Sequence, residues 1–339
     1  MKKFFAFLSF SFIILFLINL VWIVINLYLW TTTGLQSMLQ DMNFVERIYF
    51  SVMLKWIILA DLIWIGCTIV FALKRKKYKT ETEYYLQSNP IDNPRISVVI
   101  PTYNEENNVE KIVKDYISQK NVKYVFVIDN NSRDQTVKIA ERSGARVITK
   151  DKNKGFGDSC VIGFSESLKT DANIIALTEC DGTYNAADLD KMVPYLNNCD
   201  MVVGTRLIQV LIQKGNQNGI FNTWGNFFIA KLIQLKYFSL LHMGIASFTD
   251  IGCAHRCIRR ESLEKMLPDI KTDYYEKEID KDGWLFLPYL HMRGIESGLK
   301  SVEVPITFNK RSGQSKSGAN KKIRGLSLGL RFIWFILTS

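Results

Sequence analysis

Two acidic residues separated by one position, Glu179 and Asp181, form the pattern in this sequence that most directly suggests chemistry. In an extended turn, side chains at positions i and i+2 point the same way, so both carboxylates can grip one hard divalent cation. Mg²⁺ or Mn²⁺ held in this way would bridge a diphosphate and stabilise charge on it as it departs. The alternative is a surface turn without a ligand, because Asp181-Gly182 is a common turn pair.

Two further polar segments carry groups that suit a nucleoside. They read Pro101-Thr-Tyr103-Asn-Glu105 and Asp129-Asn-Asn-Ser132-Arg-Asp134. A carboxylate beside a helix N-terminus can accept hydrogen bonds from a ribose hydroxyl or from the N–H group of a base. Either segment alone is also explained by helix capping, because Asn and Asp are favoured at that position. Together, on adjacent strands, they favour a nucleotide site.

A basic segment near the C-terminus offers positive charge for phosphate groups. It reads Arg311-Ser-Gly-Gln-Ser315-Lys316, and no acidic residue occurs from Pro305 onward. Such a run beside an apolar helix suits phosphates or anionic headgroups at a membrane surface. The alternative is a solvated basic linker.

The acidic segments each follow a short apolar run rich in β-branched residues. These runs alternate with stretches of helical spacing, which predicts an α/β fold with a mostly parallel, doubly wound sheet. Ligands of such sheets bind at the carboxyl ends of the strands, where the acidic residues lie. The expected strands are Ile96–Ile100, Tyr124–Ile128, Arg146–Thr149, Asn173–Leu177 and Asp200–Val203, and the expected helices are Val109–Ser118, Asp134–Ser143 and Gly157–Leu168.

Two apolar stretches near the N-terminus predict a pair of transmembrane helices. Residues 4–30 contain no charged residue and are long enough to span a bilayer with tilt, whereas a signal peptide would have a shorter apolar core. Residues 56–73 form a second candidate span, interrupted by Asp61. A third apolar stretch, residues 326–339, contains Arg331 and is too short to cross, so we expect an interfacial helix there.

The placement of basic residues predicts the orientation in the membrane. Lys2, Lys3 and the cluster at 74–79 flank the two spans, and the positive-inside rule places them, with everything after residue 80, in the cytoplasm. The protein is therefore expected to be a multi-pass membrane protein with a cytoplasmic catalytic domain. The net charge of +10 is concentrated at these membrane-flanking clusters, so we attribute it to membrane electrostatics and expect no nucleic-acid partner.

Several motifs, taken in order, resemble those of family-2 glycosyltransferases, in the branch of dolichyl-phosphate mannosyltransferases and their polyprenyl-phosphate relatives. The resemblance covers residues 95 to about 318. The matching segments are Pro101-Thr-Tyr-Asn-Glu105, Val127-Ile-Asp129-Asn-Asn-Ser132-Arg-Asp134-Gln-Thr136, Gly144-Ala-Arg-Val147, Lys154-Gly155, Glu179-Cys-Asp181-Gly-Thr-Tyr184, Val203-Gly-Thr-Arg206 and Arg311-Ser-Gly-Gln-Ser-Lys316.

The resemblance implies a GT-A fold, an inverting reaction, a nucleoside-diphosphate sugar donor, a polyprenyl-phosphate acceptor and Mg²⁺ or Mn²⁺. Together with the apolar and basic stretches described above, it predicts three regions: a membrane hairpin at 1–80, a catalytic domain at 95–308, and a basic segment with a membrane-associated helix at 309–339. The chain departs from its relatives in two places. Glu179 stands where many carry Asp, and Gly283-Trp-Leu-Phe-Leu-Pro288 replaces an acidic helix.

Carried over by position, the resemblance implies roles for individual residues. Glu179 and Asp181 would hold the metal, and Asp181, Arg206 and Asp250 would act in catalysis. The residues that would bind the nucleotide sugar are Pro101, Tyr103, Glu105, Asp129, Lys154, Glu179 and Asp181. Those that would bind the acceptor phosphate are Arg206, Arg256, Arg311, Ser315 and Lys316.

The acceptor decides which chemistry the site must supply. A lipid phosphate is ionised at neutral pH and needs no general base, whereas a lipid hydroxyl or a polysaccharide needs one, for which Asp250 is the main candidate. A phosphate acceptor should therefore tolerate Asp250→Asn better. A non-catalytic membrane scaffold with a transferase-like domain is the remaining alternative. The sequence leaves GDP-mannose, UDP-glucose and UDP-N-acetylglucosamine open as donors.

Overall fold

The computed structural model describes residues 88–216, 219–237, 248–277, 285–312 and 322–338, and five isolated positions before residue 67. The chain divides into two compact units, of which the larger comprises residues 78–237 and 244–337 and is the one described here. Apart from these five positions, both predicted transmembrane segments lie outside the described residues, as do the basic cluster at 74–79, Ser315 and Lys316. Among the residues that are described, no helix is long and apolar enough to cross a membrane.

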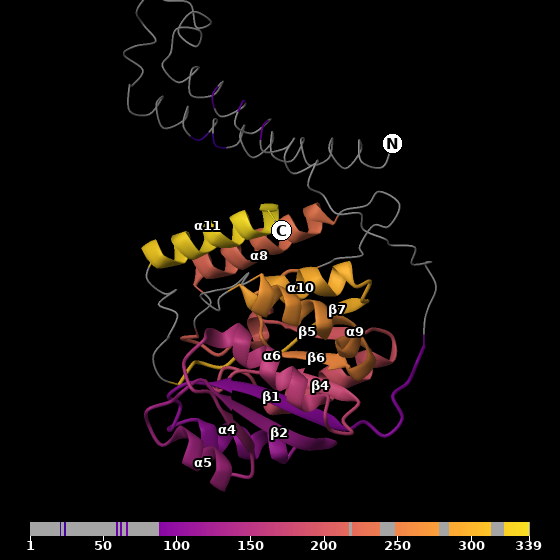
Figure 1. Cartoon of the computed structure of the whole chain (residues 1–339). Coiled ribbons are helices and arrows are strands. Elements are labelled where there is room, and N and C mark those ends of the chain that lie inside the picture. Colours follow the sequence, from indigo (N-terminus) through magenta and orange to yellow (C-terminus); the bar gives the residue numbers. More distant parts are fainter. Residues whose placement is uncertain are drawn as a thin grey trace, which may run out of the picture. The chain divides into compact units, whose positions relative to one another are not determined.

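A seven-stranded sheet forms the centre of this unit, in the order β3-β2-β1-β4-β6-β5-β7 (Figure 1). Strand β6 runs antiparallel to its neighbours β4 and β5, and the other pairs are parallel, which confirms the expected mostly parallel α/β sheet. The strands are β1 (Ile96–Thr102), β2 (Val122–Asp129), β3 (Arg146–Thr149), β4 (Ile174–Leu177), β5 (Met201–Thr205), β6 (Arg256–Arg259) and β7 (Ser301–Pro305).

All five expected strands form, within two residues of their predicted bounds, and the three expected helices form with them. Strand β6 was not expected, because its four residues include Arg256 and Arg259, which a buried strand normally lacks. Strand β7 was not expected either, since Glu303 interrupts its apolar pattern. Both become strands through pairing with β5, which is buried along its whole length.

Helices cover both faces of the sheet. Helices α4 and α5 contact each other along β2 and β3, while α6 packs on β1 and β2 and also contacts α9 and α10. The approach of α6 is so close that a Cβ on Gly163 would lie 2.2 Å from Cγ1 of Val99, so only glycine fits there. The helices are α4 (Val109–Ile117), α5 (Thr136–Arg142), α6 (Gly155–Ser167), α7 (Leu189–Met192), α8 (Ile220–Lys236), α9 (Arg260–Lys271), α10 (Phe286–Glu296) and α11 (Lys322–Thr338). Short 3-10 turns are η2 (Ala186–Asp188), η3 (Val193–Asn197) and η4 (Gln209–Leu211), and a π-helical turn is η5 (Thr272–Glu276).

Helices α8 and α11 lie side by side next to α10 (Figure 1). A small apolar core joins them to the domain, and Nζ of Lys236 donates a hydrogen bond of 2.7 Å to the carbonyl of Ile336. The apolar C-terminal stretch therefore lies in helix α11, which docks on the larger unit. The members of this core are Ile229, Ala230, Ile233, Tyr237, Phe248, Ile251, Met292, Ile295 and Ile336.

Candidate active site

The loops that follow β1 and β2 are tied together by side-chain to main-chain hydrogen bonds. The N–H of Asn104 donates to Oγ of Ser132 (2.8 Å), and Oδ1 of Asn104 accepts from the N–H of Arg133 (2.8 Å). The N–H of Glu105 donates to Oγ1 of Thr136 (2.8 Å). Neither α4 nor α5 receives a hydrogen bond from the side chain at its N-cap. Oδ1 of Asp134 accepts from the N–H of Thr136, the first residue of α5, at 3.0 Å, so this side chain also caps its helix. The hydrogen bonds between the two segments join their polar residues into one surface at the strand ends.

Asp129 lies at the centre of this surface. It ends β2, is fully buried, and accepts a hydrogen bond from the N–H of Ser132 (3.1 Å). The next residue, Asn130, accepts through Oδ1 from the N–H of Lys154 (3.1 Å), which brings the start of α6 to the same place. The residues predicted to bind the nucleotide sugar therefore come together: Pro101, Tyr103, Glu105, Asp129 and Lys154 all lie at the carboxyl ends of β1 to β3.

The acidic turn after β4 is held in a fixed shape. Oδ1 of Asp181 accepts hydrogen bonds from the N–H (3.0 Å) and from Oγ1 (2.5 Å) of Thr183. Gly182 adopts a left-handed φ of 75°, which favours glycine. The second oxygen, Oδ2, is buried and accepts no hydrogen bond from the described residues. It faces Nη2 of Arg311 at 2.6 Å, and Oε2 of Glu179 lies 3.6 Å from the same nitrogen.

This arrangement fits a divalent cation. Two carboxylates already converge on one positive charge, that of Arg311. Partial burial together with the adjacent Asp181 raises the pKa of Glu179 to about 8, because one guanidinium does not balance both carboxylates. No group of three or more His, Cys, Asp or Glu side chains converges within the described residues. A cation at this turn would thus be held by Glu179 and Asp181, with oxygens of a bound diphosphate completing its coordination.

The segment that carries Arg311 lies along the acidic turn. The N–H of Asn309 donates to the carbonyl of Thr183 (2.8 Å), and the N–H of Ser312 donates to the carbonyl of Asp181 (3.0 Å). The structure therefore brings Arg311, predicted as a phosphate ligand, directly to the predicted metal ligands.

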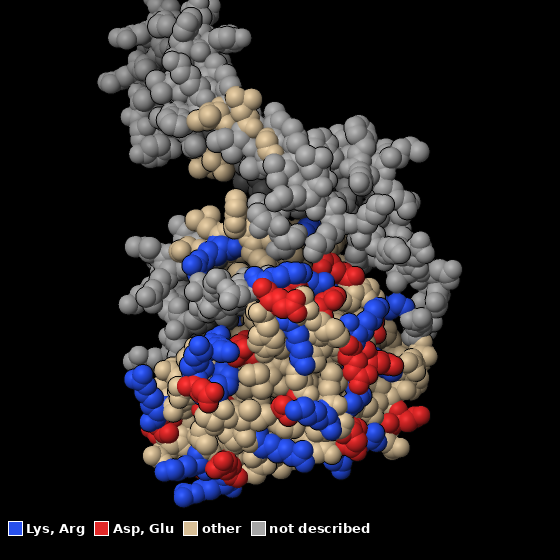
Figure 2. Space-filling view, viewed as in Figure 1, with Lys and Arg blue, Asp and Glu red and all other residues tan. Residues whose placement is uncertain are grey.

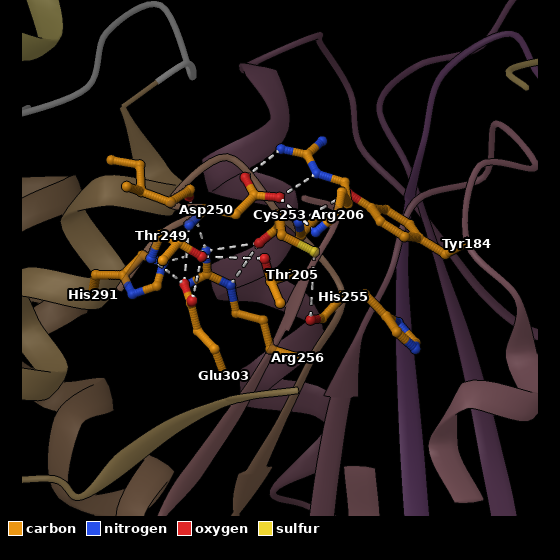
Figure 3. A network of polar contacts seen from close by, with 12 residues as sticks. Tyr184, Thr205, Arg206, Thr249, Asp250, Cys253, His255, Arg256, His291 and Glu303 are labelled. Atoms are coloured by element: carbon orange, nitrogen blue, oxygen red, sulfur yellow. Dashed lines mark hydrogen bonds and ion pairs between the residues drawn. The ribbon is translucent and has the colours of Figure 1, made fainter. Parts of the chain in front are cut away.

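Arg206 follows β5 and is held by Asp250 in a bidentate ion pair (Figure 3). Nε of Arg206 lies 2.7 Å from Oδ2 of Asp250, Nη2 lies 2.6 Å from Oδ1, and the N–H of Arg206 donates to Oδ2 at 3.0 Å. Burial opposes the charge, but Asp250 outweighs it and raises the pKa of Arg206 above its usual value. The guanidinium lies 5.2 Å from the ring centre of Phe308, and a Cβ on Gly252 would approach Nη2 to 2.9 Å.

Arg256, also predicted to bind the acceptor phosphate, has its side chain buried. Its side chain is fully buried and donates to the carbonyl of Cys253 through Nε (3.1 Å) and Nη2 (2.9 Å). Nη2 also lies 3.2 Å from Nε2 of His291. Burial lowers the pKa of Arg256 to about 10. Its main chain pairs with Leu177 at the end of β4, but its side chain binds the carbonyls of Ile251 and Cys253 and is not exposed at the strand ends.

Two residues of the site were not anticipated from the sequence. Glu303 on β7 accepts hydrogen bonds from the main chain of Thr249 and Asp250, and Phe308 lies under Arg206. The one available signal for Glu303 was an acidic residue between Val302 and Val304, because alternation in a strand would turn it to the opposite face.

Comparison with known proteins identifies the family that this geometry suggests. Residues 97–267 match the family described as "Glycosyl transferase family 2". The chain belongs to this family. The acidic turn and the polar surface at the ends of β1 to β3 are therefore features of a glycosyltransferase. The enzyme is a hexosyltransferase with a GT-A-like α/β fold.

Three relatives of this glycosyltransferase show how far the similarity extends. The uncharacterized protein MJ1222 of Methanocaldococcus jannaschii is 30% identical over 65% of this chain and 84% of its own length. The polyprenol monophosphomannose synthase of Mycolicibacterium smegmatis is 28% identical over 67% and 82%. The dolichyl-phosphate hexose transferase of Haloferax volcanii is 29% identical over 65% and 86%.

Proposed function

We propose that this glycosyltransferase moves one sugar from a nucleoside-diphosphate sugar to a polyprenyl phosphate, with inversion, at the cytoplasmic face of a membrane. The names of two relatives support the acceptor class: a polyprenol monophosphomannose synthase and a dolichyl-phosphate hexose transferase. An undecaprenyl-phosphate mannosyltransferase of Micrococcus luteus, 24% identical over 66% of this chain and 87% of its own length, points the same way.

The state of Asp250 is the observation that carries this proposal. Its side chain is fully buried, and both of its oxygens are engaged by Arg206. Because both oxygens already accept hydrogen bonds from Arg206, this carboxylate is badly placed to take a proton from a hydroxyl. Glu179 would be similarly committed once it coordinates a cation. Among the described residues, Arg206 offers positive charge and the carboxylate beside it is already engaged, which suits an acceptor that is already an anion.

The residues divide the work of such a reaction as follows. The surface around Glu105 and Asp129 would bind the nucleoside, and Glu179 and Asp181 would hold the divalent cation, which supplies charge stabilisation to the departing diphosphate. Arg206 would hold the acceptor phosphate against the sugar. An oxygen of that phosphate forms the new bond to the anomeric carbon as the bond from that carbon to the diphosphate oxygen breaks, and no proton needs to be removed.

The outer side of helices α8 and α11 supports a location at a membrane surface. It exposes large apolar side chains, including Trp224 (66% exposed) and Trp334 (71% exposed), and Arg331 lies nearby in the sequence. On the face of the domain seen in Figure 2, by contrast, Lys and Arg alternate with Asp and Glu over the part built by α4, α5 and their strands. The two N-terminal transmembrane helices and the cytoplasmic orientation belong to the same proposal.

The test uses the full-length protein in detergent with Mn²⁺ or Mg²⁺ and three labelled donors: GDP-mannose, UDP-glucose and UDP-N-acetylglucosamine. The acceptors are undecaprenyl phosphate, dolichyl phosphate and, as the matched control, undecaprenol, which carries a hydroxyl in place of the phosphate. We expect acid-labile label in the lipid fraction with a polyprenyl phosphate and not with the alcohol. Acid-stable label with the alcohol or in polymer would show that the acceptor is a hydroxyl and not a phosphate. If the protein neither transfers sugar nor binds any donor, the result would favour a non-catalytic scaffold.

A further inference from the structure

Glu303 makes an unusually complete set of hydrogen bonds for an acidic residue in a strand. Its Oε1 accepts from the N–H groups of Thr249 (2.8 Å) and Asp250 (3.0 Å), and its Oε2 accepts from Oγ1 of Thr249 (2.6 Å). All three donors belong to one turn (Figure 3). The carboxylate therefore fixes both the main chain and one side chain of that turn from the adjacent strand β7.

The same turn presents Asp250 to Arg206. Three hydrogen bonds join these two residues, so the position of the Asp250 main chain decides where the guanidinium lies. A second link runs from Thr249 to Thr205, the residue before Arg206, through their Oγ1 atoms at 3.2 Å. Glu303 thus fixes a turn that contacts both the side chain of Arg206 and the preceding residue, Thr205.

We propose that Glu303 is a positioning residue for the acceptor phosphate: it fixes the Thr249–Asp250 turn so that Asp250 holds Arg206 in one orientation. This inference rests on the proposed function, in which Arg206 binds that phosphate. A guanidinium that is already ordered loses less conformational entropy when the phosphate binds, so the effect should fall on the acceptor and spare the donor.

The test compares Glu303→Ala with Glu303→Gln in the full-length protein, at saturating donor and Mn²⁺. Alanine leaves the two N–H groups without their acceptor, and we expect the KM for undecaprenyl phosphate to rise about ten- to a hundredfold. Glutamine still accepts from both N–H groups through its amide oxygen, so its KM should stay within about threefold of wild type. The affinity for nucleotide sugar with Mn²⁺, measured without acceptor, should not change in either variant.

Asp200→Ala is the matched control. Asp200 also accepts from a main-chain N–H, that of Lys300 (2.8 Å), and from a hydroxyl, that of Ser262 (2.9 Å), but at the opposite ends of β5 and β7. It should lower thermal stability without raising the KM for the acceptor. If Glu303→Ala does not fold, Thr249→Val, which removes one of the three hydrogen bonds, should raise that KM about threefold.

Hydrogen exchange separates failure of this inference from failure of the proposed function. The amides of Thr249 and Asp250 should exchange faster in Glu303→Ala than in wild type or Glu303→Gln. Unchanged exchange, an unchanged acceptor KM, or equal losses of donor and acceptor binding would overturn the positioning role while wild-type transfer stands. Absence of wild-type transfer to any polyprenyl phosphate would instead refute the proposed function.

Discussion

Arg311 occupies the position next to Asp181 that we assign to a divalent cation. Its Nη2 lies 2.6 Å from Oδ2 of Asp181, and this oxygen accepts no hydrogen bond from the described part of the chain. The guanidinium thus balances the acidic turn in the absence of a cation. A cation bound to this oxygen would lie next to the guanidinium, and because like charges repel, Arg311 opposes its binding and so competes with it.

The first prediction concerns this competition. Arg311→Gln removes the competing charge, so the affinity for Mn²⁺ without acceptor should rise about five- to tenfold, which corresponds to roughly 1–1.4 kcal/mol. Manganese binding can be followed by electron paramagnetic resonance. Lys310→Gln makes the same change in net charge at the neighbouring exposed residue and should have little effect. An affinity equal to that of wild type in Arg311→Gln would show that the cation binds without displacing the arginine.

The second prediction concerns the metal ligands themselves. Asp181→Asn and Glu179→Gln should each raise the Mn²⁺ concentration needed for half-maximal activity by about ten- to a hundredfold, because each removes one anionic ligand. Glu179→Asp keeps the charge and should stay much closer to wild type. Asp190→Asn, at an exposed acidic residue soon after the turn, is the control. Equal manganese dependence in all four variants would show that the cation binds at another site.

The third prediction concerns the ion pair of Arg206 and Asp250. Arg206→Lys keeps the charge but cannot bind a carboxylate through two nitrogens, so kcat/KM for the acceptor should fall about ten- to a hundredfold. Asp250→Asn should cause a similar loss even with a phosphate acceptor, because it releases the arginine. The structure thus revises the expectation that a phosphate acceptor tolerates this change.

The pH profile distinguishes a role of Asp250 in positioning Arg206 from a role as general base. If it positions Arg206, the residual activity of Asp250→Asn should depend on pH as the wild-type activity does. Loss of a titrating limb from the profile in this variant would identify Asp250 as a general base.

The fourth prediction concerns stability in acid. His255 is fully buried and stacks on Tyr184, with ring centres 5.4 Å apart, and burial lowers the pKa of the histidine from 6.5 to about 4. Between these values the unfolded chain binds the proton and the folded chain does not, so stability should fall as the pH drops below 6.5. The loss from this group at pH 5 is about 2 kcal/mol.

His255→Phe keeps the ring stack and removes the titration. Chemical denaturation at pH 7.5 and pH 5 should therefore show a smaller loss of unfolding free energy in the variant than in wild type. An equal loss in both proteins would mean that His255 takes up its proton in the folded state near its usual pKa.

The sequence by itself determined the family, the mostly parallel α/β sheet and the acidic turn. These features are local: strands such as Ile96–Thr102 are continuous apolar runs, and the acidic residues follow directly after them, so periodicity and order along the chain suffice. The nucleotide-type surface was predictable for the same reason, because neighbouring parallel strands end at one edge of a sheet.

Only the tertiary structure decided what the charged side chains do. Arg206, Arg256 and Arg311 are alike in the sequence, yet one is paired with Asp250, one is buried on main-chain carbonyls, and one lies on the acidic turn. Glu303 acquires its partners through the pairing of β7 with β5, and its hydrogen bonds reach residues more than 50 positions away. The partner of a long charged side chain is set by contacts between distant segments, which no local pattern encodes.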